Sequence, residues 1–197
     1  RMGNYPQPGI KPEFEVPGLE YAGEVITVGS RVEGFKTGDH VMGLLPGGGY
    51  SEFVSVPASL AIHIPQEIPW HIAGAIPEVY ITAHDALTQC QLVAGESVLV
   101  HACGSGVGVA AIQIAKTMGA SIVLGTSNSD EKLERARTLG LDVGINPKKE
   151  NFSEKIMDAT NGNGVDVILD VIGASYWDQN FQSLAINGRI ILVGLMG

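Results

Sequence analysis

The sequence predicts an α/β protein in which a doubly wound parallel sheet follows a smaller antiparallel β-domain. Two observations lead to this fold class. Strand-like and helix-like segments alternate from residue 96 onward, as they do in a parallel sheet covered by helices on both faces. Residues 18–65 instead hold short β-branched or aromatic runs separated by glycine-rich turns. We therefore place one domain at residues 1–80 and a second at residues 81–197.

The first domain contains three strand-like runs, LEYAGEVITVG (residues 19–29), GDHVMGLL (38–45) and YSEFVSVP (50–57). They predict an antiparallel, barrel-like domain. The mixed apolar stretch at residues 70–91 is predicted to be helical, and Pro77 divides it into two helices because proline cannot continue a helix that precedes it.

The second domain is predicted to contain five strands and four helices. Its predicted strands are SVLVHA (97–102), SIVLGT (121–126), VGIN (143–146), VDVILDVIG (165–173) and GRIILVGL (188–195). Its predicted helices cover residues 107–119, 130–140, 151–160 and 177–186. Gly140 suits the C-terminal cap of the second of these helices.

The composition is globular and excludes several classes of function. Hydrophobic residues make up 45% of the 197 residues, and charged residues make up 17%. The net charge of −9 repels phosphate backbones and anionic lipids, so we expect neither nucleic acid nor a membrane as a partner. No apolar run approaches the roughly 18 residues of a membrane span. Cys90 and Cys103 cannot build a disulfide scaffold, which fits a reduced, cytoplasmic setting.

Three glycines fall within five residues where the first strand of the parallel sheet passes into its first helix. This turn binds pyrophosphate in such sheets, because glycine lets the backbone approach the ligand and the helix N-terminus offers free N–H groups. Gly106, Gly108 and Ala111 match the G-x-G-x-x-G/A spacing of the dinucleotide fingerprint. The alternative is that the glycines serve only the close packing of helix on strand.

The end of the second strand of this sheet indicates which nucleotide binds. An NAD site usually places an acid there, about 20 residues after the glycine turn. Here LGTSNS (124–129) is neutral and rich in hydroxyls, with Ser127 and Asn128 as candidate contacts. Lys132 lies one turn into the next helix and can reach a 2′-phosphate, so we expect NADP rather than NAD. An ordinary solvated lysine is the alternative interpretation.

These segments closely resemble the zinc-independent quinone oxidoreductases of the medium-chain dehydrogenase/reductase superfamily. The similarity runs in order through GLEYAGEV, TGDHVMGLLPGGGYSEFVSVP, AGAIPEVYITAHDAL, AGESVLVHACGSGVGVAAIQIAK and NGRIILVGLMG. The similarity is greatest to the tumour-suppressor-inducible and zeta-crystallin branch in the stretches LLPGGG, SGVG, and GASYW with GLMG. The resemblance implies a GroES-like catalytic domain before a Rossmann NADP-binding domain, a homodimer, and NADPH-dependent reduction of a small-molecule quinone.

We expect the chain to be part of a longer protein, because it starts at Arg1 and ends at Gly197 directly after a strand. Its GroES-like domain is then partial, and its Rossmann domain is incomplete at the C-terminal end.

The resemblance also implies which residues contact the cofactor. The pyrophosphate turn contributes Ser105, Gly106, Val107 and Gly108. The loop beside the adenosine ribose contributes Ile172 and Gly173. The nicotinamide end of the site contributes Thr82, Gly194, Leu195 and Met196.

Two departures from the resembling enzymes matter. Zinc-containing relatives carry Gly-His-Glu where this chain has Gly18-Leu19-Glu20, and Leu19 cannot bind a metal, so we expect no metal. Many NADPH-specific relatives also carry tyrosine after the asparagine of the third strand. Asn146-Pro147 stands here instead and weighs against NADP.

Hydride transfer to a quinone needs position and a water-poor cleft more than acid–base groups. Tyr5 is the candidate catalytic proton donor, since its loop borders the quinone site in the resembling enzymes; a packed loop aromatic is the alternative. His101 is either a catalytic base or a hydrogen-bonding residue at a strand end, and Cys103 is either a reactive thiol or a small buried residue.

Three functions remain open from the sequence. The first is a metal-independent NADPH:quinone oxidoreductase, and the second is an enone or enoyl reductase of the same superfamily. The third is a non-catalytic NADPH-binding protein of the crystallin kind.

Overall fold

The computed structural model describes residues 16–197, so Tyr5 lies outside the described residues. The chain divides into two compact units, residues 1–78 and 79–197.

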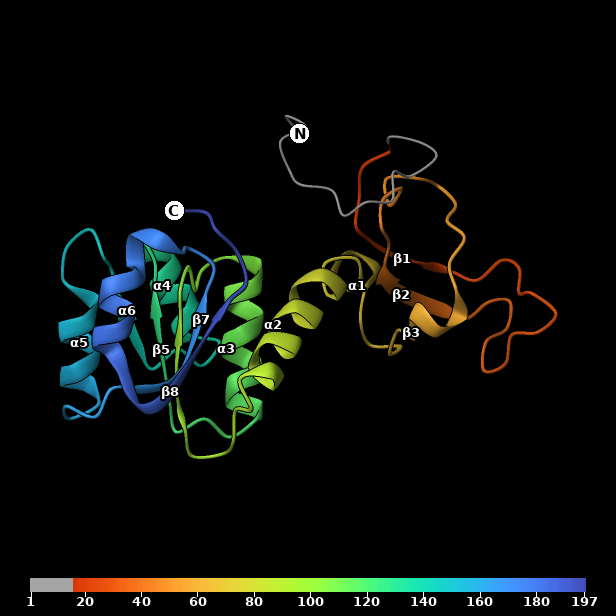
Figure 1. Cartoon of the computed structure of the whole chain (residues 1–197). Coiled ribbons are helices and arrows are strands. Elements are labelled where there is room, and N and C mark those ends of the chain that lie inside the picture. The colour runs from red at the N-terminus through yellow and green to blue at the C-terminus, as the bar shows by residue number, and fades with distance from the viewer. Residues whose placement is uncertain (1–15) are drawn as a thin grey trace. The chain divides into compact units, whose positions relative to one another are not determined.

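The first unit contains a three-stranded antiparallel sheet in the order β1 (Glu20–Glu24), β2 (His40–Leu44) and β3 (Ala61–His63) (Figure 1). Tyr21 lies opposite Gly43 in the first pair of strands, and Gly43 lies opposite Ala61 in the second. The core of this unit is small: Met42, Ile64 and Ala73 form its buried apolar cluster, and Tyr21 and Val41 are also buried.

The predicted strand YSEFVSVP (50–57) was wrong, because the third strand of the sheet is β3 instead. The start of this segment is bonded back toward the residues before β1: the Tyr50 amide donates to the Pro17 carbonyl at 2.8 Å. Phe53 is 72% exposed. Alternating apolar residues form a strand where one face is buried against a partner, and within residues 16–197 this segment gains no such face.

A short helix, α1 (Trp70–Ala73), and a longer one, α2 (Pro77–Gln89), follow the antiparallel sheet. Pro77 is the first residue of α2, where the missing N–H of proline costs no intrahelical hydrogen bond. The predicted division of residues 70–91 into two helices at Pro77 is therefore confirmed.

The second unit is a five-stranded parallel sheet in the order β6-β5-β4-β7-β8. Its strands are β4 (Ser97–Val100), β5 (Ile122–Thr126), β6 (Val143–Ile145), β7 (Val165–Asp170) and β8 (Leu184–Leu192). Its helices are α3 (Gly106–Thr117), α4 (Asp130–Arg137), α5 (Phe152–Ala159) and α6 (Trp177–Ser183). The predicted doubly wound α/β fold is confirmed.

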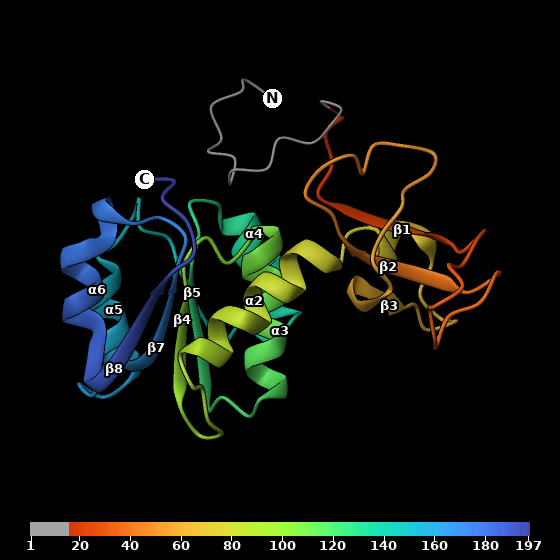
Figure 2. The same ribbon diagram turned by 45° about the vertical axis from the view of Figure 1, so that its right-hand side comes forward.

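Helices cover both faces of this sheet (Figures 1 and 2). One apolar cluster joins α2, α3 and α4 to the face that carries Val98 and Val100. A second cluster joins α5 to the opposite face, which carries Leu99, and α6 lies beside α5 on that side. Successive side chains of a strand point to opposite faces, so β4, all of whose residues are buried, is covered from both sides.

The helix predicted at residues 177–186 is shorter, because α6 ends at Ser183 and β8 begins at Leu184. Leu184 pairs with Val165 of β7, whereas Ile186 is 93% exposed and Asn187 has a φ of 64°. Leu184 already has extended backbone, with φ −73° and ψ 136°, so the helix ends before it, and Ile186 and Asn187 lie within β8.

The strand order places β4 between β5 and β7. From β4 the chain winds outward through β5 and β6, and it then returns to place β7 on the other side of β4. Ligands of such sheets bind at this switch point, outside the carboxyl ends of the strands. Within residues 16–197, no helix has both the length and the apolar character that a bilayer crossing requires.

Candidate functional site

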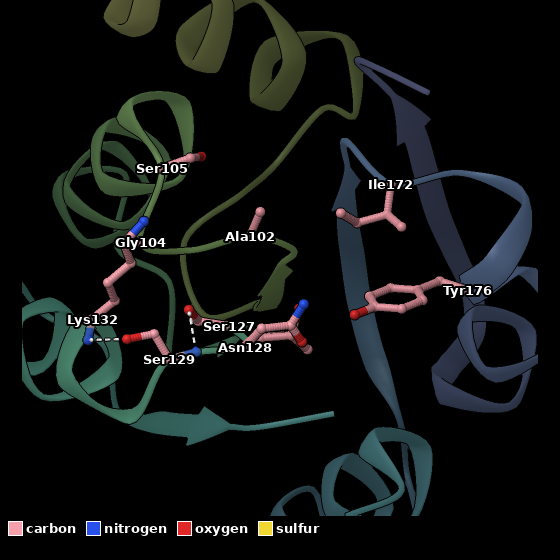
Figure 3. A pocket seen from close by; sticks show the side chains of 10 residues that line it. Ala102, Gly104, Ser105, Ser127, Asn128, Ser129, Lys132, Ile172 and Tyr176 are labelled. Carbon is pink, nitrogen blue, oxygen red and sulfur yellow. Dashed lines mark hydrogen bonds between the residues drawn. The ribbon is translucent and has the colours of Figure 1, made fainter. Parts of the chain in front are cut away.

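A pocket of about 260 Å³ opens at the switch point, where β4, β5 and β7 end (Figure 3). We call it the strand-end pocket. It is lined by Ala102, Gly104, Ser105, Thr126, Ser127, Asn128, Ser129, Lys132, Ile172 and Tyr176. The first three follow β4, the next five follow or end β5, and the last two follow β7.

The turn between β4 and α3 forms one wall of the strand-end pocket. Ala102 has a φ of 47°, and the Cys103 amide donates to the Thr126 carbonyl at 2.9 Å, which ties this turn to the end of β5. Ser105 is the N-cap of α3, because its Oγ accepts a hydrogen bond from the Gly108 amide at 3.1 Å. The other N–H groups of the first turn have no acceptor within the helix, so the N-terminus of α3 carries a partial positive charge.

The glycines of this turn are required by packing. A Cβ on Gly108 would lie 2.5 Å from the Ala102 carbonyl oxygen and 2.6 Å from the Cys103 Cα, both of which are backbone atoms. A Cβ on Gly104 would lie 2.7 Å from the Cβ of Lys132. Close packing therefore accounts for Gly108, and Gly104 leaves the space across which the Lys132 side chain lies.

The end of β5 contributes hydroxyl groups. The Ser129 amide donates to Ser127 Oγ at 3.3 Å, and Ser129 Oγ in turn accepts from the Lys132 amide at 3.4 Å as the N-cap of α4. Lys132 is exposed and is the one residue among the ten pocket-lining residues that carries a charge. An anionic group is the ligand that this wall suits.

Asp130, the first acid after β5, is not among the pocket-lining residues. One of its carboxylate oxygens accepts from Asn146 Nδ2 at 2.7 Å, and the other pairs with Lys149. The hydrogen bonds from Lys149 and then from Asn146 lower the pKa of Asp130. The carboxylate is thus engaged by residues that follow β6, and not by the wall of the pocket.

His101 lies behind the pocket with no exposed surface. Its Nδ1 is 2.9 Å from Thr126 Oγ1, and its Nε2 is 2.7 Å from Asn180 Oδ1. Burial lowers the pKa of His101, and the hydrogen bond to Asn180 and the nearby charge of Asp170 oppose this shift. His101 is therefore a hydrogen-bonding residue at the strand end, bonded to side chains, and its burial argues against a role as a catalytic base.

Cys103 is also fully buried, and burial raises the pKa of its thiol to about 11. A reactive cysteine needs a lowered pKa and access to solvent. The structure thus favours the small buried residue over the reactive thiol.

The structure brings part of the predicted cofactor set together. Five predicted residues line the strand-end pocket: Ser105, Ser127, Asn128, Lys132 and Ile172. Three others form the start of α3 next to it: Gly106, Val107 and Gly108. Gly173 is buried just after Ile172.

The predicted nicotinamide contacts lie outside the lining of the pocket. The segment after β8, which holds Gly194, Leu195 and Met196, runs beside the loop after β7: the Met196 amide donates to the Val171 carbonyl at 3.2 Å. Thr82 is half-buried in α2. These assignments, like that of Tyr5, stay predictions.

Five residues of the pocket were missed: Ala102, Gly104, Thr126, Ser129 and Tyr176. Thr126 and Ser129 belong to the same hydroxyl-rich run as Ser127, so the sequence held a signal for them. Tyr176 enters from a short 3-10 helix after β7, and its proximity to His101, with ring centroids 4.9 Å apart, follows only from the strand order.

No group of three or more histidine, cysteine, aspartate or glutamate side chains in residues 16–197 is arranged to hold a metal ion. The absence of metal from the working protein stays a prediction, based on Leu19 in place of a histidine ligand.

Two family models match the chain. The model described as "Alcohol dehydrogenase GroES-like domain" matches residues 1–66, and the model described as "Zinc-binding dehydrogenase" matches residues 106–197. A quinone oxidoreductase of Pseudomonas aeruginosa is 35% identical over 196 residues, which are 98% of this chain and 59% of that protein. The chain therefore spans little more than half the length of this relative.

Several solved structures share the fold. A CurK enoyl reductase superposes with a TM-score of 0.84 at 34% identity, over 92% of this chain and 55% of that one. The mycobacterial protein Rv1454c complexed with NADPH gives a TM-score of 0.81 at 31% identity, over 90% and 56%. An NAD-dependent alcohol dehydrogenase gives 0.86 at 32% identity, over 94% and 63%.

The two matched domains, their order and these relatives place the chain in a known family. The chain belongs to the medium-chain dehydrogenase/reductase superfamily, within its zinc-independent quinone oxidoreductase-like family.

Proposed function

We propose that this member of the quinone oxidoreductase-like family carries the nucleotide site of a metal-independent oxidoreductase that transfers a hydride from NADPH to a quinone. One observation carries the proposal. The strand-end pocket joins three features in one cavity: the N-terminus of α3, the neutral hydroxyl-rich end of β5, and the cation of Lys132. Each of these features favours a phosphorylated ligand over a neutral one.

The residues of the pocket fit the adenosine end of NADPH. The first turn of α3 offers N–H groups to the pyrophosphate. Ser127, Ser129 and Lys132 offer hydroxyls and a cation to the 2′-phosphate. Ile172 and Tyr176 supply an apolar and an aromatic side chain against which a flat base can pack. A volume of about 260 Å³ suits one end of a dinucleotide, since whole ligand pockets span about 300–1,000 Å³.

Three features bear on the choice between NADPH and NADH. Asn146 and Lys149 hold the Asp130 carboxylate, which makes it a poor partner for the ribose 2′-hydroxyl that NADH presents. Pro147 stands where many NADPH-specific relatives carry tyrosine, and this difference favours NADH. Lys132 lines the pocket and supports NADPH, which is the nucleotide that we propose.

When bound, the nicotinamide supplies the hydride, and the protein supplies position and exclusion of water. We assign the Tyr5 hydroxyl as the donor of the proton that the reduced quinone oxygen requires. A homodimer and a cytoplasmic location belong to the same proposal and rest on the family resemblance.

An enone or enoyl reductase is the second candidate, and the similarity to the CurK enoyl reductase favours it. Such an enzyme uses the same nucleotide site but delivers the hydride to carbon instead of oxygen. A non-catalytic NADPH-binding protein of the crystallin kind would bind the nucleotide and reduce neither substrate.

Oxidation of NADPH and of NADH by the full-length protein, followed at 340 nm with an ortho-quinone or an enone, separates these functions. Turnover with the quinone and NADPH supports the proposal. Conversion of the enone to the saturated ketone without quinone turnover supports the second candidate. Tight NADPH binding without turnover of either substrate supports the non-catalytic protein.

Zinc content tests the metal-independent part of the proposal. Because Leu19 stands where zinc-containing relatives carry histidine, the purified protein should hold no stoichiometric zinc. Treatment with a chelator should leave its activity unchanged. One zinc per chain by elemental analysis would contradict this expectation.

A further inference from the structure

Four polar side chains form a hydrogen-bonded series that starts on the wall of the strand-end pocket and continues behind it: Thr126, His101, Asn180 and Asp170. We call it the buried polar series. We propose that this series positions the two walls of the pocket for the nucleotide, and that His101 and Asn180 are positioning residues for cofactor binding. The inference rests on the proposed nucleotide site.

The direction of each hydrogen bond in the series follows from its Asp170 end. The Asp170 carboxylate can only accept, so Asn180 must present its Nδ2 group to Asp170 Oδ2, at 3.0 Å. Asn180 Oδ1 therefore faces His101 Nε2, which must donate, at 2.7 Å. Burial disfavours the charged imidazolium, so His101 Nδ1 is an acceptor, and the Thr126 hydroxyl donates to it at 2.9 Å. The series thus selects the neutral His101 tautomer that carries its proton on Nε2.

The series is sealed from water. His101, Asn180 and Asp170 have no exposed surface, and Thr126 is 1% exposed. The His101 ring packs edge-on against Tyr176 and against Phe152, with centroids 4.9 and 5.1 Å away. An unpaired polar group in such a place is costly, so these side chains hold one arrangement while every bond is made.

The series joins two walls that the sheet itself does not pair. Thr126 ends β5, and the loop after Asp170 follows β7, but β4 lies between those two strands. His101, directly after β4, bridges them. At the far end, Asp170 Oδ1 accepts from the amides of Ile172, at 2.7 Å, and Gly173, at 3.0 Å.

Both ends of the series therefore terminate in residues of the pocket, since Thr126 and Ile172 line it. A change in the middle should move the walls without removing any group that touches the nucleotide. This separates a positioning role from direct contact.

Asn180→Leu in the full-length protein tests the proposal, because Asn180 does not line the pocket and leucine has a similar size. We expect NADPH affinity, measured by fluorescence titration, to fall about tenfold. A change of this size corresponds to the free energy of about one buried hydrogen bond, here one that positions the pocket walls. Ser183→Ala is the matched control. Ser183 is also fully buried in α6, but its Oγ donates only to the Gln179 carbonyl, at 2.7 Å. The control should lose thermal stability and keep NADPH affinity.

If Asn180→Leu does not fold, a pair of changes at Thr126 decides. Valine keeps the shape of threonine but cannot donate to His101, whereas serine keeps the hydroxyl. Thr126 also lines the pocket, so the nitrogen-15 signals of the His101 ring are measured beside NADPH affinity. Weaker NADPH binding and shifted His101 signals in Thr126→Val, with both unmutated in Thr126→Ser, support the proposal. Weaker binding in Thr126→Val with unchanged His101 signals marks direct contact and overturns the proposal. Equal affinity in both variants overturns it, as does a folded Asn180→Leu protein that binds NADPH like the unmutated one.

Nitrogen-15 NMR of the histidine rings tests the series without any nucleotide. His101 should show the Nε2–H tautomer, and its pKa should lie below that of an exposed histidine because the ring is buried. An Nδ1–H tautomer would overturn the inference. Unmutated protein that binds neither NADPH nor NADH, with the Nε2–H tautomer present, would instead refute the proposed function while leaving the buried series in place.

Discussion

The two ends of the strands in the parallel sheet both carry polar side chains, but they use them differently. At the amino ends, Ser97 donates to the Asp166 carboxylate from its amide at 2.8 Å and from its hydroxyl at 2.7 Å. Arg189 there binds both oxygens of Glu96 at 2.7 Å and also donates to the carbonyl of Cys90 at 2.9 Å. At the carboxyl ends, the N-terminus of α3 and the side chain of Lys132 face a pocket.

The difference separates polar groups that stabilise the fold from polar groups that are available to a ligand. At the amino ends, donors and acceptors satisfy one another between neighbouring elements. At the carboxyl ends, the donors and acceptors of the buried polar series satisfy one another in the same way. The groups that line the strand-end pocket instead face the space that a ligand would fill. Changes at the amino ends should therefore cost stability alone, whereas changes at the carboxyl ends should alter binding.

The largest effect is expected at the glycine turn, where the two roles coincide. A Cβ in Gly108→Ala would collide with the backbone of Ala102 and Cys103, so the turn must shift. We expect a loss of stability of about 1–3 kcal/mol and a loss of NADPH binding. Gly29→Ala is the control, because its Cβ would meet only Val32 Cγ2 at 3.8 Å. A Gly108→Ala protein with unmutated melting temperature and affinity would contradict the packing seen here.

Charge reversal of two lysines compares the two ends directly. Lys132→Glu places a negative charge in the pocket and should lower the preference for NADPH over NADH by at least about tenfold. Lys116→Glu, at the end of α3, breaks the ion pair with Asp142 and should cost about 1 kcal/mol of stability without changing that preference. Calorimetric titration with both nucleotides measures the first effect, and thermal unfolding measures the second. Equal affinity of the unmutated protein for both nucleotides would contradict the NADPH preference inferred from Lys132 and would agree with the indication from Pro147.

The amino-end pair of Glu96 and Arg189 should affect stability only, and in a pH-dependent way. The hydrogen bond from Arg189 lowers the pKa of Glu96 from its ordinary value of 4.5. The stabilisation is therefore complete above pH 4.5 and is lost as the pH falls through the lowered pKa. Glu96→Gln should cost about 1 kcal/mol in urea unfolding at neutral pH, and the difference from the unmutated protein should shrink in acid. NADPH affinity should not change, and a large loss of affinity would contradict the separation of the two ends.

The smallest effect is expected at Ser105. Its hydroxyl caps α3, so Ser105→Ala should cost about 1 kcal/mol of stability and change NADPH affinity little. Ser105→Asp sharpens the comparison, because aspartate also caps a helix but brings a negative charge to the phosphate site. It should keep the melting temperature and weaken NADPH binding. The opposite pattern would mean that the serine acts on the ligand and not on the helix.

Local patterns in the sequence determined much of this protein. The alternation of strand and helix, the division at Pro77 and the hydroxyl-rich run with Lys132 each depend on residues within a few positions of one another. Periodicity and turn chemistry act over that range, so these features could be predicted.

Features that depend on partners far along the chain were decided only by the tertiary structure. YSEFVSVP has the alternation of a strand, but in the described part of the chain it buries no face, and β3 is the third strand of the sheet. Gly108 could be assigned to the ligand or to packing until the Ala102 carbonyl was found against it. His101 meets Thr126 from 25 residues away and Asn180 from 79 residues away, because the strand order brings β4, β5 and β7 to one end of the sheet. Hydrogen-bond partners and burial are properties of that arrangement, and no local stretch of the chain contains them.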